Sequence, residues 1–233
     1  MRVCLASTSP ARLMLLQQFG IRPLTVAPAV DEEAVIAAVE EAEARVLAPD
    51  EHVLLLARRK AADVAARLAD DIPGFDGIVI GGDSMFEIDG RVLGKPYTPE
   101  NAAARWHDMR GRTGILHSGH AVVRVSPDAA PHEVHAVAAA AVTFAGDITD
   151  AEIDAYVATG EPLQVAGAFT VDSLGGAFIT HVDGDPSTVV GMSVSTLRRL
   201  VREVGADWTA LWNTVDPSVG GSDGATGENL QSL

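Results

Sequence analysis

Cysteine is nearly absent from the sequence, which holds a single one, Cys4, among 233 residues. No disulfide can form within such a chain, and a reducing cytoplasm is the compartment to expect. The first residues are too polar, and too soon interrupted by Pro10, for a secretory signal. No stretch approaches the ~20 apolar residues of a membrane-spanning helix. We therefore expect a soluble cytoplasmic protein with no membrane partner.

Positive charge is also scarce, with 17 Lys and Arg against 32 Asp and Glu and a formal net charge of −15. A field of this sign repels a phosphate backbone, so a nucleic-acid polymer is not an expected partner. A small anionic substrate would need either a local gathering of the few cations or a metal ion. The positions of Arg and Lys are informative for that reason.

Strand and helix patterns are mixed without strict alternation, and no internal repeat is visible. The length suits one domain, with room for two lobes around a cleft, and 47% hydrophobic residues can supply a core. The pattern predicts the α/β class, a mixed α/β architecture around a twisted sheet. We expect the domain to span 1–216. Residues 217–233 are rich in Gly, Ser, Asp and Asn, and are expected to form a disordered tail.

Capping and turn residues predict most of the elements. We expect helices over 10–19 and 32–46, a helix capped by Asp50 that runs to about 69, and helices over 99–110, 150–159 and 194–204, with Thr98 and Thr149 as the caps of the first two of these. Strands are expected over 2–6, 24–27, 77–82, 119–126, 133–144, 168–171 and 177–182. Gly81 and Gly82 are expected to end their strand. Asp89-Gly90 predicts a tight hairpin, because this turn requires positive φ at both residues.

Polar residues cluster first in "STSPAR", where a strand runs into a helix. The free N–H groups of a helix N-terminus favour phosphate, and the hydroxyls of Ser7 and Ser9 and the guanidinium of Arg12 can add donors. The alternative is that Ser9 only caps the helix and that Arg12 is a surface residue. For this segment taken alone, the alternative is favoured, because joints between a strand and a capped helix are common.

A second polar set lies in "GGDSMFEIDGRVLGKP". It is not a P-loop, because three residues instead of four separate Gly90 from Gly94, and a proline follows the lysine. Asp83, after a buried strand, suits a catalytic carboxylate, and Lys95 sits in a stiff Gly-Lys-Pro turn. Each can equally be a turn residue. Glu32, at a helix start, and Lys60, on a helix face, are weak signals alone, and the histidines lack zinc-binding spacing.

Taken in order, these motifs resemble the Maf family of nucleoside triphosphate pyrophosphatases, in the inosine-triphosphatase-like superfamily. The resemblance rests on "STSPAR", "DEE" (31–33), "ARRKA" (57–61), "GGDS" (81–84), "LGKP" (93–96), "RGRTG" (110–114), "AGAF" (166–169) and "STVVGMS" (187–193). It implies an elongated α/β fold with two lobes around a central cleft, which can form a homodimer. It also implies hydrolysis of nucleoside triphosphates to monophosphate and pyrophosphate with Mg or Mn.

Site roles carried over from the resemblance are expectations for this chain. Asp83 matches the general base and, with Glu32, the metal-holding acids. Substrate contacts are expected from Ser7, Ser9, Arg12, Lys60, Ser84, Lys95, Arg112 and Asp172.

Several positions depart from the family pattern. Ala11 stands where an arginine is usual, Ser84 where threonine is usual, and Asp172 where the thymidine- and uridine-selective branch has glutamine. Thr188 and the Met192-Ser193 pair also differ. A catalytically weak nucleotide-binding regulator linked to septum formation is therefore the alternative to an enzyme that removes non-canonical or surplus nucleotides. A scaffold protein without a nucleotide site is a third reading.

Overall fold

The structure is a computed structural model and describes residues 1–213, whose strands form one mixed sheet. The strands are β1 (Arg2–Ala6), β2 (Leu24–Thr25), β3 (Gly77–Ile88), β4 (Arg91–Leu93), β5 (Thr113–Ser126), β6 (Ala129–Phe144) and β7 (Ile179–Asp183). Their order is β2-β1-β3-β5-β6-β7, with β4 paired to β3. β1 is parallel to β2 and β3, and the other pairs are antiparallel. The predicted α/β class is confirmed.

Helices cover the sheet and fill its ends. They are α1 (Pro10–Gln18), α2 (Glu32–Glu43), α3 (Pro49–Asp71), α4 (Pro99–Met109), α5 (Asp150–Ala158), α6 (Pro186–Val190) and α7 (Val194–Glu203), with 3₁₀ turns η1 (Glu161–Gln164), η2 (Ala166–Ala168), η3 (Leu174–Phe178) and η4 (Trp208–Leu211). Within residues 1–213, no helix combines the length and the apolar character that crossing a membrane requires.

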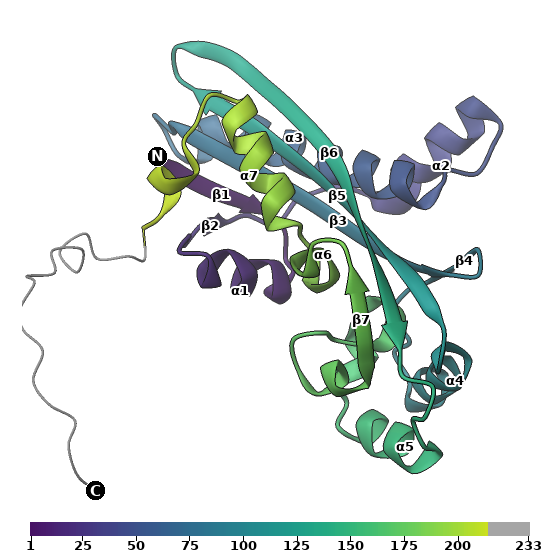
Figure 1. Cartoon of the computed structure of the whole chain (residues 1–233). Helices are drawn as coiled ribbons and strands as arrows, with labels where there is room; N and C mark the ends of the chain where they lie inside the picture. Colours follow the sequence, from purple (N-terminus) through teal and green to yellow (C-terminus); the bar gives the residue numbers. More distant parts are fainter. Residues whose placement is uncertain (214–233) are drawn as a thin grey trace, which may run out of the picture.

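Two lobes share the long strands β3, β5 and β6 (Figure 1). In the first lobe, α3 packs on one face of the sheet, where Val79 is buried, and α1 and α7 pack on the other face, over Ile80. In the second lobe, α4 and α5 cover the far end of the same strands, and Trp106 packs edge-to-face against Phe144 with ring centroids 5.5 Å apart. The expected elongated, twisted sheet with two lobes is therefore confirmed.

The strand expected over 77–82 continues to Ile88, so Gly81 and Gly82 do not end it. Gly81 serves a different purpose. A Cβ built there would lie 2.2 Å from the Ala57 carbonyl oxygen, so the absence of a side chain lets α3 lie directly on β3. As a result, Asp83 is placed in the middle of a strand and not at its end.

Other expectations differ in detail. The helix expected over 32–46 ends at Glu43, and Val46 is 80% exposed beyond it. Asp50 does not cap α3, which begins at Pro49; the cap function falls to Glu51, whose carboxylate accepts the Ala48 N–H at 2.9 Å. Residues 168–171 form the end of η2 and a loop, not a strand.

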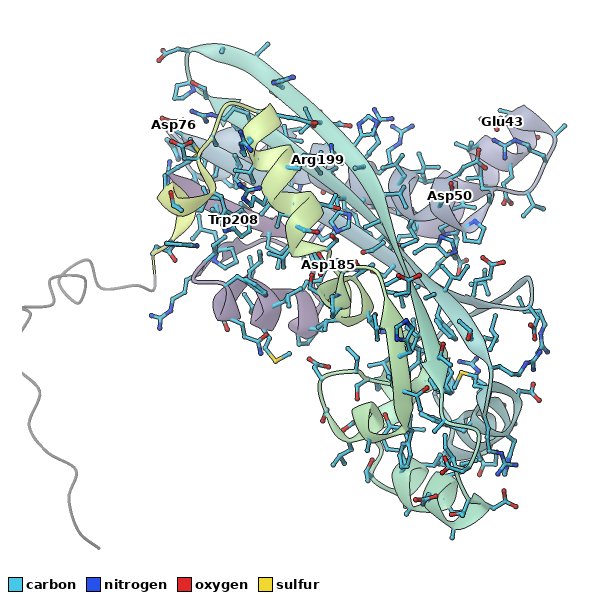
Figure 2. All side chains as sticks on the ribbon, viewed as in Figure 1. Glu43, Asp50, Asp76, Asp185, Arg199 and Trp208 are labelled. Carbon is cyan, nitrogen blue, oxygen red and sulfur yellow. The ribbon has the colours of Figure 1, made fainter. Side chains whose placement is uncertain are left out.

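Helix α2 projects from the body of the molecule, with Glu43 near its outer end (Figures 1 and 2). Its sequence has the expected amphipathic pattern, yet none of its residues is fully buried. It contacts α3, where Glu32 is ion-paired with Lys60, and the partly buried Val35 and Val39 line a hollow between the two helices. The expected domain limits of 1–216 and the tail at 217–233 reach past the described residues, and these limits and the homodimer stay predictions.

Candidate active site

A cleft of about 640 Å³ opens between the two lobes. Its walls come from the β1–α1 loop, α3, β3, the turn after β4, the segment 164–172 and the end of α6. The lining includes Ser7, Ser9, Arg12, Glu32, Lys60, Asp83, Ser84, Lys95 and Asp172. Residues that are widely separated in the sequence, and that were weak signals one by one, thus face one cavity.

The β1–α1 loop folds tightly around its own hydroxyls. Ser9 is the N-cap of α1, and its Oγ accepts the Arg12 N–H at 3.5 Å. The Ser7 Oγ accepts the Ser9 N–H at 3.1 Å and a guanidinium N–H of Arg12 at 3.4 Å. Because the positive end of the helix and two hydroxyls face the cleft, this loop can bind an anion.

The Arg12 guanidinium is held by the end of α6 and by β3. Its Nε donates to the Gly191 carbonyl oxygen at 2.9 Å, and its Nη2 donates to the Ser84 Oγ at 3.0 Å. The same carbonyl accepts the hydroxyls of Ser84, at 3.1 Å, and of the fully buried Ser118, at 3.2 Å. Burial lowers the pKa of Arg12, while the carboxylates of Asp83 and Glu32 oppose that shift. The guanidinium is therefore oriented before any ligand arrives.

Two carboxylates converge on one buried ammonium. Lys60 Nζ lies 2.8 Å from Asp83 Oδ1 and 2.9 Å from Glu32 Oε1. The side chain of Lys60 is 8% exposed, that of Asp83 15% and that of Glu32 50%. All three residues line the cleft, and Glu32, the first residue of α2, is the most exposed of them. An ion pair this enclosed is less screened by solvent than a surface pair.

Asp83 and Ser84 are consecutive residues of β3, so their side chains leave the strand on opposite faces. Asp83 bonds Lys60 on the α3 side, and Ser84 bonds Arg12 on the α6 side. Both residues line the cleft. The strand therefore runs through the site and presents a carboxylate on one side and a hydroxyl on the other.

The second lobe supplies the remaining wall. Lys95 follows β4 and is exposed toward the cleft, and Asp172 lies in the loop between η2 and η3. This wall also brings Gln164 and Thr170, which the sequence motifs did not single out. Gly191 was seen as part of "STVVGMS", but nothing in a sequence indicates that its carbonyl holds an arginine.

Comparison with known proteins shows the family of the chain. A family model described as "Maf-like protein" matches residues 2–204. The chain belongs to the Maf family. A relative from Leifsonia xyli subsp. xyli is 58% identical over 219 residues, covering 94% of this chain and all of its own length, and one from Rhodococcus jostii is 49% identical, covering 89% and 94%. Both relatives are named nucleoside triphosphate pyrophosphatase.

A solved structure from Mycobacterium abscessus, titled nucleoside-triphosphatase / dITP/XTP pyrophosphatase, also resembles this Maf protein. It is 15% identical over 64% of this chain and 77% of its own, with a TM-score of 0.30. That overlap is too weak to carry an argument about the site.

Arg112 does not join the cleft of this Maf protein. Its guanidinium is ion-paired with Asp89 in the β3–β4 turn, and its Nη1 donates to the Asp108 carbonyl at 2.9 Å. Arg112 is not among the residues that line the cavity. It ties the β3–β4 turn to the end of α4, which is a structural task.

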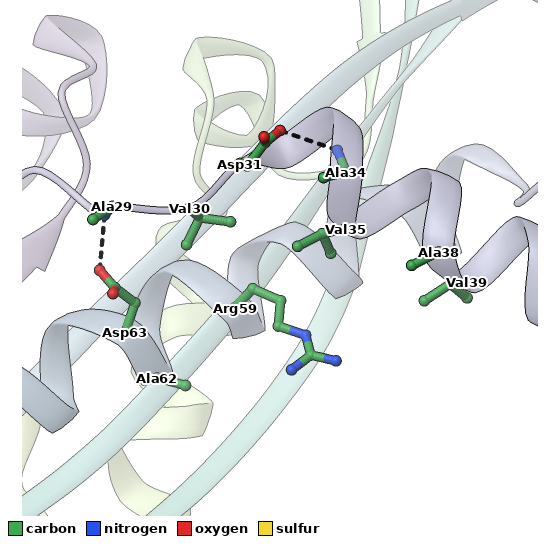
Figure 3. A pocket seen from close by; sticks show the side chains of 10 residues that line it. All are labelled: Ala29, Val30, Asp31, Ala34, Val35, Ala38, Val39, Arg59, Ala62 and Asp63. Carbon is green, nitrogen blue, oxygen red and sulfur yellow. Dashed lines mark hydrogen bonds between the residues drawn. The ribbon is translucent and has the colours of Figure 1, made fainter.

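A second hollow of this Maf protein, about 580 Å³, lies between α2 and α3 (Figure 3). Its lining is mostly alanine and valine, and Arg59 is its single cation. Its carboxylates are already engaged: Asp63 accepts the Ala29 N–H at 2.8 Å, and Asp31 accepts the Ala34 N–H at 3.0 Å. The interlobe cleft, and not this hollow, has the cations that a polyphosphate requires.

Residues 1–213 hold no cluster of three or more His, Cys, Asp or Glu side chains that could bind a metal alone. Two carboxylates nevertheless point at one position, because the oxygens of Glu32 and Asp83 both lie within 2.9 Å of Lys60 Nζ. Mg²⁺ is typically bound by one or two carboxylates together with substrate phosphates and water. The donor set of this Maf protein fits that mode of binding.

Proposed function

We propose that this protein hydrolyses nucleoside triphosphates to a nucleoside monophosphate and pyrophosphate, and so removes non-canonical or surplus nucleotides. The observation that carries the proposal is that Arg12, Lys60 and Lys95, from three separate segments, line one cleft with Asp83. Three carboxylates, those of Glu32, Asp83 and Asp172, line the same cleft, so these cations suit an anionic ligand that arrives with a divalent metal ion. The names of the close relatives support the same activity.

The triphosphate would bind along the first lobe. The N-terminus of α1 and the hydroxyls of Ser7 and Ser9 donate to phosphate oxygens, and Arg12 can add its remaining N–H groups. Lys60 and Lys95 neutralise charge from α3 and from the turn after β4. Arg12 and Lys60 are already held by hydrogen bonds before binding, which lets them stabilise the charge that develops as the anhydride breaks.

A divalent cation, Mg²⁺ or Mn²⁺, would be held by Glu32 and Asp83 together with the phosphates. Such an ion neutralises phosphate charge and makes the phosphorus more electrophilic. Lys60 Nζ lies 2.8 Å from Asp83 Oδ1 and 2.9 Å from Glu32 Oε1, and so brings the two carboxylates together in the cleft. Both are hard oxygen ligands, which these cations prefer.

Asp83 is the residue we assign as general base. Its Oδ1 accepts from Lys60, and no hydrogen bond within residues 1–213 involves its Oδ2, which is free to accept from a water molecule. The water oxygen would form a bond to the α-phosphorus, its proton would pass to Asp83, and the bond from the α-phosphorus to the bridging oxygen would break. Pyrophosphate leaves with the electron pair of that bond.

Ser84 and Asp172 complete the proposed substrate contacts. Ser84 supports Arg12 at 3.0 Å from the strand that carries the base. Asp172 lines the cleft from the loop between η2 and η3, and we assign it to the nucleoside end. Arg112 is left out of the proposed site because Asp89 already pairs with it.

A panel assay tests the proposal. Purified protein is incubated with canonical and modified nucleoside triphosphates and Mg²⁺ or Mn²⁺, and pyrophosphate is measured. Release with at least one substrate, lost on chelation of the metal, is expected. No release with any of them would contradict the proposal.

The alternative, a nucleotide-binding regulator linked to septum formation, rests on the uncharged Ala11 in the cleft wall. Binding of triphosphates without turnover would favour it. We also propose that the protein acts in the cytoplasm, which its single, buried cysteine suits; burial raises the pKa of the Cys4 thiol to about 11 and keeps it unreactive.

A further inference from the structure

Glu161, the first residue of η1, accepts hydrogen bonds from five donors although it does not line the cleft. The donors are Tyr156 OH at 2.9 Å, Ser173 Oγ at 2.7 Å, Leu174 N at 3.3 Å, Gly175 N at 3.0 Å and the Thr170 hydroxyl. Four of the five lie in the segment 170–175. The fifth, Tyr156, belongs to the buried core of the second lobe.

The segment 170–175 has little other regular structure to fix it. It leaves η2, passes the cleft at Thr170, Val171 and Asp172, and enters η3. It also wraps closely on itself: a Cβ added to Gly175 would lie 2.6 Å from the Tyr156 hydroxyl and 2.8 Å from the Thr170 carbonyl oxygen. The Glu161 carboxylate is thus the point at which this wall of the cleft is fastened to the lobe.

The charge on Glu161 strengthens this attachment. Partial burial raises its pKa, but the hydrogen bonds from Thr170, Ser173 and Gly175 outweigh it and lower the pKa to about 2. The side chain is therefore an anion at any pH at which the protein would work. Hydrogen bonds to an ionised acceptor are stronger than those between neutral groups.

We propose that Glu161 is a positioning residue for the nucleoside-binding wall, and that it fixes Thr170, Val171 and Asp172 in the place where they meet the nucleoside. This inference rests on the proposed function. The phosphate-binding residues are held by other elements, namely the α1 N-terminus, α3 and β3. Loss of the Glu161 anchor should therefore weaken recognition of the nucleoside and leave recognition of the phosphates intact.

The test uses Glu161→Gln, which keeps the shape of the side chain but removes the charge and one acceptor. KM and kcat are measured with the best nucleoside triphosphate, and inorganic tripolyphosphate, which has no nucleoside, is used as a competitive inhibitor. We expect KM to rise about tenfold, with kcat and the inhibition constant of tripolyphosphate close to wild type.

Glu152→Gln is the matched control. Glu152 is also a carboxylate of the second lobe with a pKa lowered by hydrogen bonds, from the N–H and hydroxyl of Thr149, but it caps α5 and does not touch the segment 170–175. It should leave KM unchanged. Ser173→Ala, which removes one exposed donor, should raise KM in the same direction as Glu161→Gln but by less, and it provides the test if Glu161→Gln does not fold.

Other outcomes would overturn the inference. One is a rise in the inhibition constant of tripolyphosphate that equals the rise in KM. Another is a fall in kcat alone, and a third is no change in a folded Glu161→Gln protein. If the wild type binds nucleotides but does not hydrolyse them, the proposed function fails; titration of the same variants with nucleotide and with tripolyphosphate then still tests Glu161, with selective loss of nucleotide affinity as the expected result.

Discussion

Lys60 Nζ lies 2.8 Å from Asp83 Oδ1, although the lysine comes from the middle of a long helix and the aspartate from the middle of a long strand. The approach depends on Gly81, which lets α3 sit against β3. The Lys60 ammonium thereby binds both the proposed base, Asp83, and the proposed metal-binding acid, Glu32. The proposed chemistry therefore depends on the packing of α3 against β3.

Lys60→Met should reduce kcat/KM by about 10²-fold or more, because a fixed positive charge beside the reacting phosphates is lost. It also leaves Asp83 and Glu32 without their shared partner. Steady-state kinetics with the best triphosphate measures the effect. Arg59→Met is the control, since Arg59 is the neighbouring residue of the same helix but faces the second hollow; an equal loss in both variants would mean that Lys60 has no special part in the site.

Gly81→Ala should lower the free energy of unfolding by at least about 1–3 kcal/mol, because the new methyl group would meet the backbone of α3. Urea unfolding measures this loss. Gly94→Ala is the comparison, as nothing lies within 4 Å of a Cβ at Gly94 and no positive φ is needed there. Similar stability of the two variants would show that α3 does not require the glycine.

The fold was predictable wherever a local signal decides the structure. Ser9, Thr98 and Thr149 cap their helices as expected, and Asp89-Gly90 turns with φ of 49° and 71°. The length of β3 was not predictable, because glycines usually interrupt strands, and their use here depends on a helix twenty residues earlier in the chain. Only the three-dimensional structure shows that α3 packs directly on β3 at Gly81.

The site was predictable as a set of motifs but not as a set of contacts. Resemblance to the Maf family brought Glu32, Lys60 and Asp83 together, whereas each short motif alone is equally typical of a surface or turn residue. The same resemblance also selected Arg112, which forms an ion pair with Asp89 of the β3–β4 turn and does not line the cleft. Glu161 carries no signal in the sequence, because its five donors lie in a segment without a regular pattern.

Asp172→Asn should change the preference among bases by about tenfold in relative kcat/KM. A carboxylate only accepts hydrogen bonds, whereas the amide of asparagine both accepts and donates, so a base that offers N–H groups loses an ion-assisted partner. The panel of triphosphates is compared between wild type and variant. Asp154→Asn, on the exposed side of α5, should keep the wild-type order; an unchanged order for Asp172→Asn would place the base elsewhere.

His120 should make the protein sensitive to mild acid. Burial, and then the charge of Arg12, lower its pKa to about 4, and its Nε2 accepts the Ser193 N–H at 2.8 Å, so the folded state keeps it neutral. The unfolded chain takes up a proton below about pH 6.5, and the folded chain does so only near pH 4. Stability is therefore fully present above that window and falls as the pH drops through it.

The expected loss between pH 7 and pH 5 is about 2 kcal/mol from this one residue. Denaturant unfolding at the two pH values measures it. His120→Gln should be less stable at pH 7 but should lose less on acidification, whereas His132→Gln, at an exposed position of β6, should behave as wild type. An equal pH dependence in all three proteins would exclude His120 as the cause.

Attack of water on the α-phosphorus, with Asp83 as the base, is the central claim, and isotope incorporation tests it most directly. Wild type and Asp83→Asn are each run in water enriched in the heavy oxygen isotope. Mass spectrometry then determines whether the label lies in the nucleoside monophosphate or in the pyrophosphate. We predict that the label enters the nucleoside monophosphate and not the pyrophosphate, and that the variant is slower by about 10²–10⁴-fold while nucleotide still binds. Label in the pyrophosphate, or an Asp83→Asn protein as fast as wild type, would contradict the account.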